Sequence, residues 1–299
     1  MKKYLFLLVF SALVFSVLVL ALKPDFQAVE IRNPVTSDVK NGVVIPAKAV
    51  EVTPNIFYLG ATTDEGRVVE GYAIVTPKKA KAKGTCNNNN VCEPELGEKN
   101  NCSDCSGGGT NTGESTCYGF LAKGAKWKTT EPYVVNPSNT SGLNEAFVAS
   151  NLDTDIAKWE NAAGTNIIGA GSVTSDLLVA DMVATDGKNE VYFGSISDSG
   201  AIAITIVWGI FRGPPGQREL VEWDQVYDQV DFNWSSSGEA GKMDFENIAT
   251  HELGHSVGLG DLYTVECLEE TMYGYASEGE TKKRTLESGD ITGIQELYN

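Results

Sequence analysis

The sequence predicts an α/β fold of the α+β kind over residues 117–299, with a helix that carries metal-binding side chains. Three observations support this. Residues 201–210 are almost wholly apolar, which is typical of a strand buried on both faces. Residues 144–161 carry helical spacing at Phe147, Leu152, Ile156 and Trp159. Residues 243–261 combine helical spacing with metal-binding side chains. Further strands are expected over residues 127–135, 191–196 and 221–232.

A smaller β-rich domain is expected over residues 23–83. Its strand-like runs are separated by Pro and Gly, and the turn Asp64-Glu65-Gly66 predicts a hairpin. Lysines alternate with alanines near its end, over residues 78–83, as in a solvated linker. This domain is either a prodomain or an accessory domain.

A cysteine-rich insert is expected over residues 84–106, followed by a flexible linker over residues 107–116. The insert has too few apolar residues for a core, so covalent staples must hold it. Disulfides are favoured over a four-thiolate zinc site because the chain carries an export signal. Asn and acidic side chains in the insert make a structural Ca²⁺ ion a second candidate cofactor. The candidate disulfide cysteines are Cys86, Cys92, Cys102 and Cys105, and the calcium candidates are Asn87, Asn89, Glu93, Glu95, Glu98 and Asp104.

Residues 1–22 are typical of an export signal, because Lys2 and Lys3 precede an apolar run over residues 4–22. The run is either a signal peptide that is cleaved or a retained membrane anchor, since its length is close to the ~20 residues of a spanning helix. We therefore expect a secreted or cell-surface protein. The net charge of −17 argues against nucleic acid as a partner, since phosphate binding needs clustered basic residues.

The side chains that carry the chemistry lie in the stretch MDFENIATHELGHSVGLGD, residues 243–261. On a helix that advances ~100° per residue, His251, Glu252 and His255 share one face. Two imidazoles one turn apart can bind one Zn²⁺ ion. Glu252 lies where a general base could reach a water on the metal.

A turn must end this helix, and Gly258 suits a left-handed turn that returns Asp261 toward the metal. Three protein ligands would leave a position open for water, as in catalytic zinc sites. The chain has two histidines, both in this motif, so any third protein ligand is not a histidine. The alternative is that they are ordinary helix residues, and their spacing around Glu252 speaks against it.

The stretch HELGHSVGLGD resembles the zinc motif HExxHxxGxx(H/D) of the metzincin proteases, and among them the matrixins. TMYGY at residues 271–275 resembles the family's Met-turn, and residues 286–299 resemble the final helix of matrixin catalytic domains. The resemblance covers roughly residues 126–299 and implies a zincin-like catalytic domain with a twisted mixed sheet, a zinc helix and a C-terminal helix. It implies zinc ligands at His251, His255 and Asp261, a base at Glu252, a methionine beneath the metal at Met272, and a side chain that either lines the substrate pocket or simply packs at Tyr275.

The sequence departs from the matrixin pattern in several places. Asp261 stands where matrixins mostly have histidine, although snapalysin-like metzincins use Asp. The interval from Asp261 to Met272 is longer than usual, and proline does not follow Tyr273, which leaves the shape of the specificity pocket open. We find no cysteine-switch motif before the domain. Cys117 and Cys267 remain once the cysteines of the insert are set aside, and we expect them to pair.

These observations predict an exported zinc-dependent endopeptidase that acts on a protein or peptide substrate with Glu252 as general base. The substrate is expected to lie along a cleft-edge strand, for which residues 201–210 or a neighbouring strand are the candidates. One alternative is a thermolysin-like zinc peptidase with a downstream glutamate ligand, against which Gly258 and Met272 speak. Another is a non-catalytic surface protein for binding or adhesion, against which Glu252 argues. The candidate glutamates are Glu266, Glu269, Glu270 and Glu287.

Overall fold

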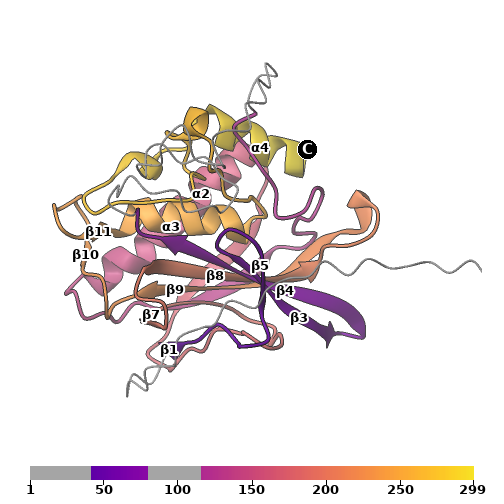
Figure 1. Cartoon of the computed structure of the whole chain (residues 1–299), viewed down its shortest axis with the longest axis horizontal. Coiled ribbons are helices and arrows are strands. Elements are labelled where there is room, and N and C mark those ends of the chain that lie inside the picture. Colours follow the sequence, from indigo (N-terminus) through magenta and orange to yellow (C-terminus); the bar gives the residue numbers. More distant parts are fainter. Residues whose placement is uncertain (1–41, 80–115) are drawn as a thin grey trace, which may run out of the picture. The chain divides into compact units, whose positions relative to one another are not determined.

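The computed structural model describes residues 42–79 and 116–299, which lie within one compact unit. In this part of the chain, nine strands form one mixed sheet, and three α-helices accompany it (Figure 1). The predicted α/β class is confirmed. Among the described residues, no helix has the length and apolar character needed to cross a membrane. The predictions for residues 1–22, for the cysteine-rich insert with its calcium ligands, and for most of the linker lie outside the described residues.

The described part of the chain contains three α-helices and eleven strands. The helices are α2 (Glu145–Ala163), α3 (Phe245–Ser256) and α4 (Ser288–Tyr298). The strands are β1 (Gly42–Val43), β2 (Val50–Thr53), β3 (Ile56–Asp64), β4 (Arg67–Pro77), β5 (Glu131–Asn136), β6 (Ile168–Val173), β7 (Asn189–Ile196), β8 (Ala201–Ile210), β9 (Glu219–Asp228), β10 (Trp234–Ser235) and β11 (Met243–Asp244).

The sheet has the order β2-β3-β4-β8-β9-β7-β5-β6, and β1 pairs with β7 outside this path. Strands β5, β6, β7 and β9 run parallel to their neighbours in this group, whereas β8 is antiparallel to β9. Strand β8 is buried on both faces as its apolar run predicted. One face of the sheet packs against the helices, and α3 lies across β8 and β9 (Figure 1).

Helix α2 forms where helical spacing predicted it and supports α3 from behind. Asn144 caps its start by accepting a hydrogen bond from the Phe147 amide (3.0 Å), and Gly164 ends it at φ 73°. Trp159 is fully buried, and its Nε1 donates to the Thr250 carbonyl of α3 (2.9 Å). This contact fixes α2 against the helix that carries the two histidines.

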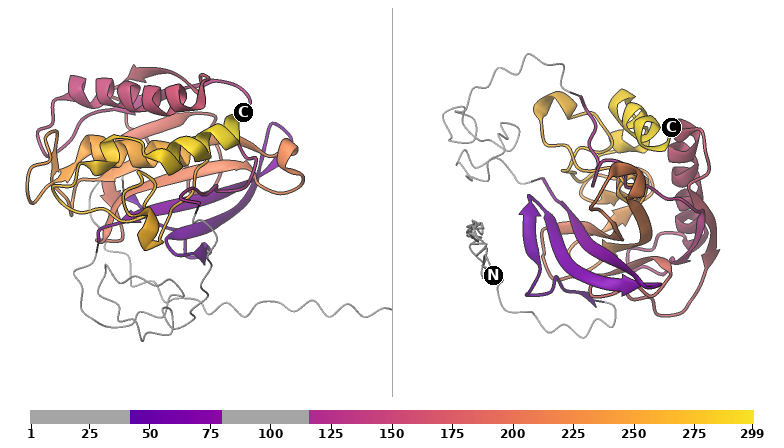
Figure 2. Two further views of the ribbon diagram at one scale, coloured as in Figure 1. Left: turned by 90° about the horizontal axis from the view of Figure 1, so that it is seen from above. Right: turned by 90° about the vertical axis from the view of Figure 1, so that its right-hand side faces the viewer.

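The N-terminal strands belong to the same sheet as the rest of the described chain, whereas the sequence predicted a separate β-rich domain. The predicted hairpin is present, since β3 and β4 pair around a turn at Glu65 and Gly66. Strand β4 then pairs along its length with β8, and Figure 2 shows these indigo strands continuing the sheet. Val69, Ala73 and Ile74 are fully buried because hydrophobic clusters pack on both faces of β4, with Ile74 in one cluster and Val69 and Ala73 in the other. The alternation of apolar residues in the sequence identifies such strands, but it does not indicate which strand of the sheet they pair with.

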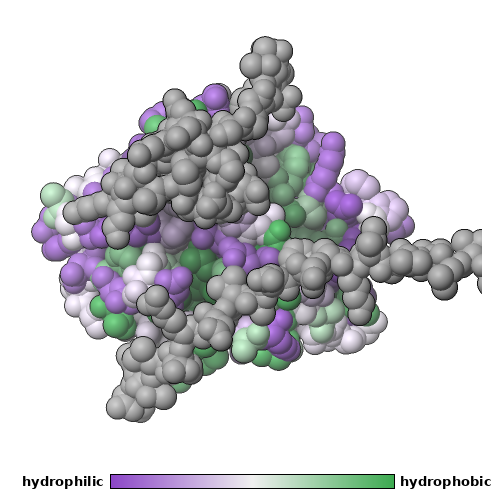
Figure 3. Space-filling view, viewed as in Figure 1, coloured by the Kyte–Doolittle hydropathy of each residue, from purple (hydrophilic) through white to green (hydrophobic). Residues whose placement is uncertain are grey.

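The outer strands of this hairpin are only half covered. Hydrophobic and hydrophilic residues lie side by side on the face in Figure 3, and the exposed large apolar side chains of this region include Val50 and Val52 of β2 and Val68 at the start of β4. Strand β2 is exposed at every position. The hairpin is therefore held mainly through β4, its innermost strand.

Close approach of β4 to β8 makes Gly71 a sensitive position. A Cβ at Gly71 would stand 2.7 Å from the Trp208 ring. We expect Gly71→Val to lower the free energy of unfolding by about 1–3 kcal/mol through overpacking, although valine favours strands. Chemical denaturation of the variant checks this. Thr63→Val, which places the same residue at an exposed position of β3, should change little, and equal effects of both variants would contradict the packing account.

Candidate metal centre

Helix α3 begins at a strongly held cap. The Asp244 side chain accepts a hydrogen bond from the Asn247 amide (3.1 Å), and the Arg284 guanidinium binds the same carboxylate (2.6 Å). Within the helix, His251, Glu252 and His255 are all 0% exposed. The three polar side chains that the sequence places on one helix face therefore point into the protein, where any unmet hydrogen bond is costly.

The chain reverses direction directly after α3. The Gly258 amide donates to the His255 carbonyl (2.9 Å), and the Leu259 amide donates to the Gly254 carbonyl (2.9 Å). Gly258 has φ +105°, and a Cβ there would lie 2.8 Å from the Ala125 carbonyl oxygen. Glycine is therefore required both for the backbone conformation and for the close approach. The turn carries Asp261 back over the helix.

Asp261 meets both imidazoles. Its Oδ1 lies 3.3 Å from His251 Nε2 and 3.4 Å from His255 Nε2, and its side chain is 1% exposed. These three side chains form a group of ligand atoms that could hold a metal ion. The structure thus brings together the two histidines and the aspartate that the sequence singled out.

Each imidazole is oriented by a backbone carbonyl. His251 Nδ1 lies 2.7 Å from the Thr271 carbonyl oxygen, and His255 Nδ1 lies 3.0 Å from the Leu259 carbonyl oxygen. Nδ1 must carry the proton to donate to a carbonyl, so Nε2 is left as a lone-pair donor toward Asp261. Metal ligands commonly have such hydrogen bonds behind them, because these fix the ring and its tautomer.

Burial and the neighbouring charges act in opposite directions on this group. Burial raises the pKa of Asp261, but attraction to the His255 and His251 imidazoles outweighs burial and holds that pKa well below its usual value. Burial lowers the pKa of His255, and the Asp261 carboxylate outweighs burial and raises it. A carboxylate that stays ionised while buried suits a site that receives a cation.

Four buried atoms at this place lack a hydrogen-bond partner: His251 Nε2, His255 Nε2, Asp261 Oδ1 and Glu252 Oε1. Such atoms are rare in native interiors and call for an explanation. A tetrahedral zinc site with bonds of ~2.0–2.1 Å separates its ligand atoms by roughly 3.3–3.4 Å. The two distances from Asp261 Oδ1 to the imidazoles match that separation, so the residues present fit a zinc ion.

Glu252 is held differently from the three other side chains. Its Oε2 accepts a hydrogen bond from Thr205 Oγ of β8 (2.5 Å), which leaves Oε1 without a partner. The carboxylate is therefore anchored at one oxygen and free at the other. This arrangement can exchange a proton at Oε1 while the side chain stays in place.

Met272 lies directly against the helix between the two histidines. A Cβ at Gly254 would stand 2.2 Å from Met272 Sδ and 2.9 Å from the Trp159 ring. The backbone of this segment is anchored by Asp290 of α4, which accepts hydrogen bonds from the amides of Thr271 (2.7 Å) and Met272 (3.1 Å). The methionine thus forms a floor under the turn of α3 that carries the imidazoles.

Three side chains that hydrogen-bond to residues of the centre were not predicted from the sequence. Tyr263 OH donates to Asp261 Oδ2 (3.0 Å), and Lys283 Nζ donates to the Thr271 carbonyl (3.0 Å) behind His251. Burial lowers the pKa of Lys283 to about 8. Thr205, which holds Glu252, is the third. Tyr263 lies in the unusually long interval before Met272, which was the only signal available.

Tyr275 is 8% exposed and packs against Tyr263, with ring centroids 5.4 Å apart. It therefore borders the side chain that holds Asp261, and its role in a substrate pocket stays a prediction. Cys117 and Cys267 form a disulfide with an S–S distance of 2.11 Å, the pair that the sequence predicted. The disulfide ties the start of this region to the loop that follows Asp261.

The alternative glutamate ligands lie elsewhere. Glu270 Oε2 accepts hydrogen bonds from the amides of Gly289 (3.0 Å) and Asp290 (3.1 Å), and Glu287 caps the start of α4. The Glu269 side chain is 74% exposed. None of these glutamates belongs to the group around His251 and His255.

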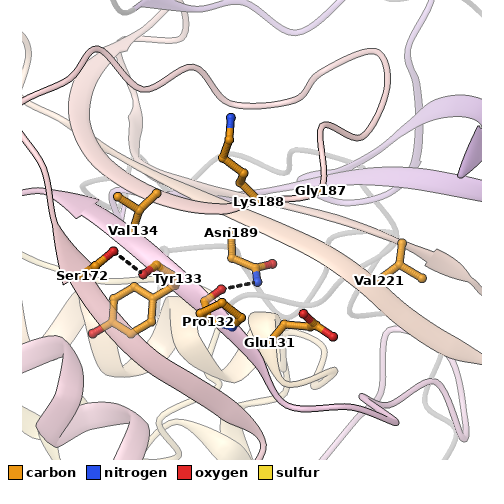
Figure 4. A pocket seen from close by; sticks show the side chains of 9 residues that line it. All are labelled: Glu131, Pro132, Tyr133, Val134, Ser172, Gly187, Lys188, Asn189 and Val221. Atoms are coloured by element: carbon orange, nitrogen blue, oxygen red, sulfur yellow. Dashed lines mark hydrogen bonds between the residues drawn. The ribbon is translucent and has the colours of Figure 1, made fainter. Parts of the chain in front are cut away.

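A surface pocket lies apart from this centre. It is lined by residues of β5, β6, β7 and β9 and by the end of the loop before β7 (Figure 4). In it, Asn189 Nδ2 donates to the Pro132 carbonyl (2.8 Å) and Ser172 Oγ to the Tyr133 carbonyl (3.4 Å). None of the four unpartnered atoms of the metal centre belongs to its lining, so we do not assign the chemistry to this pocket.

Comparison with known proteins agrees with this geometry. Residues 214–299, which include α3 and Asp261, match the family model of the matrixins. This part of the chain is similar to the matrixins, a branch of the metzincins. The chain is 29% identical over 179 residues to Metalloendoproteinase 2-MMP of Arabidopsis thaliana, and 24% identical over 181 residues to Matrilysin of Rattus norvegicus. These alignments cover 54% and 60% of this matrixin-like chain.

The matrixin-like chain spans 42% of the length of the Arabidopsis relative and 61% of the rat relative. Among solved structures, metalloproteinase-II from Bacteroides fragilis aligns over 82% of this chain and 77% of its own, at 10% identity and a TM-score of 0.31. The matrixin likeness implies zinc as the metal of the centre.

The contact between Gly254 and Met272 generates a prediction for this site. Alanine is intrinsically favoured over glycine inside a helix by about 1 kcal/mol. We nevertheless expect Gly254→Ala to destabilise the protein by about 1–3 kcal/mol, because the added methyl group would collide with Met272. Thermal unfolding measures the effect, and Asn161→Ala at an exposed position of α2 is the control. An increase in stability in Gly254→Ala would show that the floor of the site is not closely packed.

Proposed function

We propose that this protein is an exported zinc-dependent endopeptidase that hydrolyses peptide bonds in protein or peptide substrates. The observation that carries the proposal is the convergence of three buried, unpartnered ligand atoms from His251, His255 and Asp261, next to which Glu252 has an unpartnered Oε1 on the same helix. The matrixin likeness of residues 214–299 supports the same activity. Export is supported by the basic and apolar pattern of residues 1–22 and by the Cys117–Cys267 disulfide.

In this proposal His251 Nε2, His255 Nε2 and Asp261 Oδ1 hold the zinc ion. When bound, zinc supplies a Lewis acid that polarises the scissile carbonyl and acidifies water. The backbone carbonyls of Thr271 and Leu259 hold the proton of each imidazole on Nδ1, so that Nε2 offers its lone pair to the metal. A calcium ion in the cysteine-rich insert stays a separate prediction.

Glu252 acts as the general base. Its free Oε1 takes a proton from the attacking water and gives it to the leaving amine, while Thr205 holds Oε2 so that the carboxylate does not swing away. Met272 supports the helix turn from below. Tyr275, which packs against Tyr263, is the candidate for lining the substrate pocket. Each step uses a side chain that is already in position.

Glu252→Gln tests the base. The variant keeps the shape of the side chain and the metal ligands, so we expect it to retain one equivalent of zinc and to lose at least ~100-fold in peptide turnover. Asp261→Ala should instead lose zinc, as measured by metal analysis after dialysis. A Glu252→Gln protein with unchanged turnover would refute the assigned base. Retention of zinc by Asp261→Ala would favour the alternative with a downstream glutamate, and a wild-type protein that never binds zinc would favour a non-catalytic binding protein.

The N-terminal hairpin bears on how this activity is controlled. Strand β8 supplies Thr205 to Glu252, and its outer edge is occupied by β4, with Ile74 opposite Thr205. The chain beyond β4 continues to the segment after Met272, where the Lys79 amide donates to the Ala276 carbonyl (2.8 Å). An extended peptide that added to β8 would need the place that β4 fills. The predicted substrate strand thus has no free edge here.

The turn between β2 and β3 also reaches the metal centre. Asn55, at φ 64°, donates from Nδ2 to Tyr263 OH (3.1 Å), and Tyr263 in turn bonds Asp261. The Pro54 carbonyl lies 3.3 Å from the same hydroxyl. The hairpin therefore covers the side of the centre from which Asp261 comes.

We propose that residues 42–79, the segment that contains the hairpin, act as a prodomain. The segment keeps the peptidase latent because β4 occupies the edge of β8 to which a substrate would add. Complete burial of His251, Glu252 and His255 agrees with this, because a peptide cannot reach them in this conformation of the chain. The lysine-rich residues 78–83 offer a place for activating cleavage. No thiolate is needed for such latency.

Specific cleavage tests the latency. A recognition sequence for a selective protease is inserted after Lys79, and turnover of a peptide library is compared before and after cutting. We expect at least ~10-fold faster turnover after cutting, increasing further on dilution as the hairpin dissociates. Asn55→Ala should raise the activity of the intact chain. If the intact chain, verified by mass spectrometry, is already as active as the cut chain, the hairpin is a permanent accessory part. Cut Glu252→Gln is the control for the added protease.

A further inference from the structure

Lys283 is a lysine with no exposed surface. It lies in η4 (Lys282–Arg284), a short 3-10 helix between Met272 and α4, and it is 0% exposed. Lysines are almost never fully buried unless an acid pairs with them. In the described part of the chain, this ammonium instead donates to two backbone carbonyls, those of Thr271 (3.0 Å) and Tyr273. Burying a charge in this way is costly, so its presence needs an explanation other than stability.

The two carbonyls lie on either side of Met272, in residues 271–274, which we call the Met272 segment. The carbonyl of Met272 itself points to the opposite side, where it accepts a hydrogen bond from the Leu262 amide (2.9 Å). Leu262 directly follows Asp261 in the sequence. The Met272 segment therefore has Lys283 on one side and the loop that carries Asp261 on the other.

The Met272 segment also supports one of the two imidazoles. The Thr271 carbonyl oxygen lies 2.7 Å from His251 Nδ1, and Lys283 Nζ lies 3.5 Å from the same nitrogen. The imidazole and the ammonium therefore share one carbonyl oxygen, which has two lone pairs. His255 is supported elsewhere, because its Nδ1 lies 3.0 Å from the Leu259 carbonyl in the turn after α3. Of the two histidines, His251 is thus the one that depends on the Met272 segment.

The other end of the lysine is fixed to α3. The Lys283 backbone amide donates to Asn247 Oδ1 (2.8 Å), and the neighbouring Arg284 guanidinium binds the Asp244 carboxylate (2.6 Å). Asp244 and Asn247 lie at the start of α3, the helix that carries the histidines. Lys283 therefore links this helix to the Met272 segment, and its loss would free the two to move relative to each other.

The charge of Lys283 does not by itself favour metal binding. Burial outweighs the attraction of Glu280 and Asp261 and lowers the pKa of Lys283 to about 8, so the side chain is mostly protonated at pH 7. A positive charge repels a metal cation nearby. The lysine can therefore support a metal ion only through geometry, by holding the ligands where the ion needs them.

We propose that Lys283 is a positioning residue of the metal centre, which binds the carbonyls on either side of Met272 and so keeps His251 and Asp261 at the separation that zinc needs. The proposal rests on the zinc centre of the proposed function. Lys283 acts through the Met272 segment rather than by touching the reacting atoms. Groups that orient metal ligands in this way typically contribute about 10–100-fold to metal affinity.

Lys283→Met in the full chain tests this, because methionine fills a similar volume without the ammonium. We expect the Kd for zinc, measured by competition with a chelator, to rise by about 10–100-fold. The Tm of the metal-free protein should stay the same or rise, since an apolar side chain replaces a buried charge that has no ion-pair partner in the described part of the chain. Lys282→Met is the matched control. The Lys282 ammonium of the same 3-10 helix binds the Leu268 carbonyl, outside the Met272 segment, so zinc affinity should not change.

The histidine ring signals give a second readout, because the chain has only two histidines. In zinc-loaded protein with isotope-labelled imidazoles, each Nδ1 proton gives its own magnetic resonance signal. In Lys283→Met we expect the His251 signal to shift and the His255 signal to stay, since Leu259 lies outside the Met272 segment. A general disturbance of the fold would move both signals.

Unchanged or tighter zinc binding in Lys283→Met would overturn the proposal, because the repulsion between charges would then outweigh the hold on the ligands. Weaker binding with equal shifts of both imidazole signals would overturn it too. If Lys283→Met does not fold, Lys283→Gln, which is also uncharged, is measured in the same way. A wild type that binds no zinc would contradict the proposed function itself, whereas wild-type binding that the variant retains would contradict only the role of Lys283.

Discussion

The reversal of the chain at Gly258 is the constraint on which the metal centre depends. Two imidazoles on one helix face can be specified by spacing alone, but the third group has to return from beyond the end of the helix. The return is tight, because the Ala125 carbonyl and the Leu297 side chain close in at 2.8 and 2.9 Å from where a Cβ would be. Ala125 belongs to the segment that begins at Cys117, and the disulfide to Cys267 holds that segment beside the turn. The position of Asp261 is thus determined from both sides.

The same sheet both supports the centre and closes it. Strand β8 holds Glu252 through Thr205 on the helix side and pairs with β4 along its edge. Closing a site in this way strengthens every electrostatic interaction inside it, and it also leaves any unmet polar atom without water. A closed centre with four unpartnered atoms is therefore costly unless a cation occupies it. Burial of the centre therefore requires that a metal ion bind there.

The sequence was most informative where the chemistry is local. His251, Glu252, His255 and Asp261 lie within eleven positions, so helix geometry and one glycine turn were enough to predict that they converge. The sheet could be predicted as a class, because alternation and apolar runs identify strands. Their pairing could not, since strand partners are set by packing over long separations. For this reason the N-terminal strands were expected as a separate domain, although β4 belongs beside β8.

Tyr263 shows a different limit of the sequence. Its hydroxyl is the contact through which the hairpin reaches Asp261, yet a tyrosine in a loop has no periodic pattern to mark it. The only trace was the long interval between Asp261 and Met272. That interval also holds Cys267, so the added length gives the loop both a covalent anchor and a hydrogen bond to the metal ligand. An insertion relative to a family pattern is therefore better treated as a candidate site than as a spacer.

Each face of the sheet carries a buried carboxylate, and the two carboxylates differ in the charges that surround them. On the helix face, the carboxylate of Asp261 is buried beside two imidazoles, whose attraction holds its pKa well below the ordinary value. On the opposite face, Glu222 is equally buried but faces Asp181, and its pKa is raised to about 8. The loop over residues 174–188 and β7 supply the two buried acids of β9 with backbone amides for all but one oxygen. Glu222 Oε1 stays buried without a hydrogen-bond partner, whereas Asp261 Oδ1 faces two imidazoles.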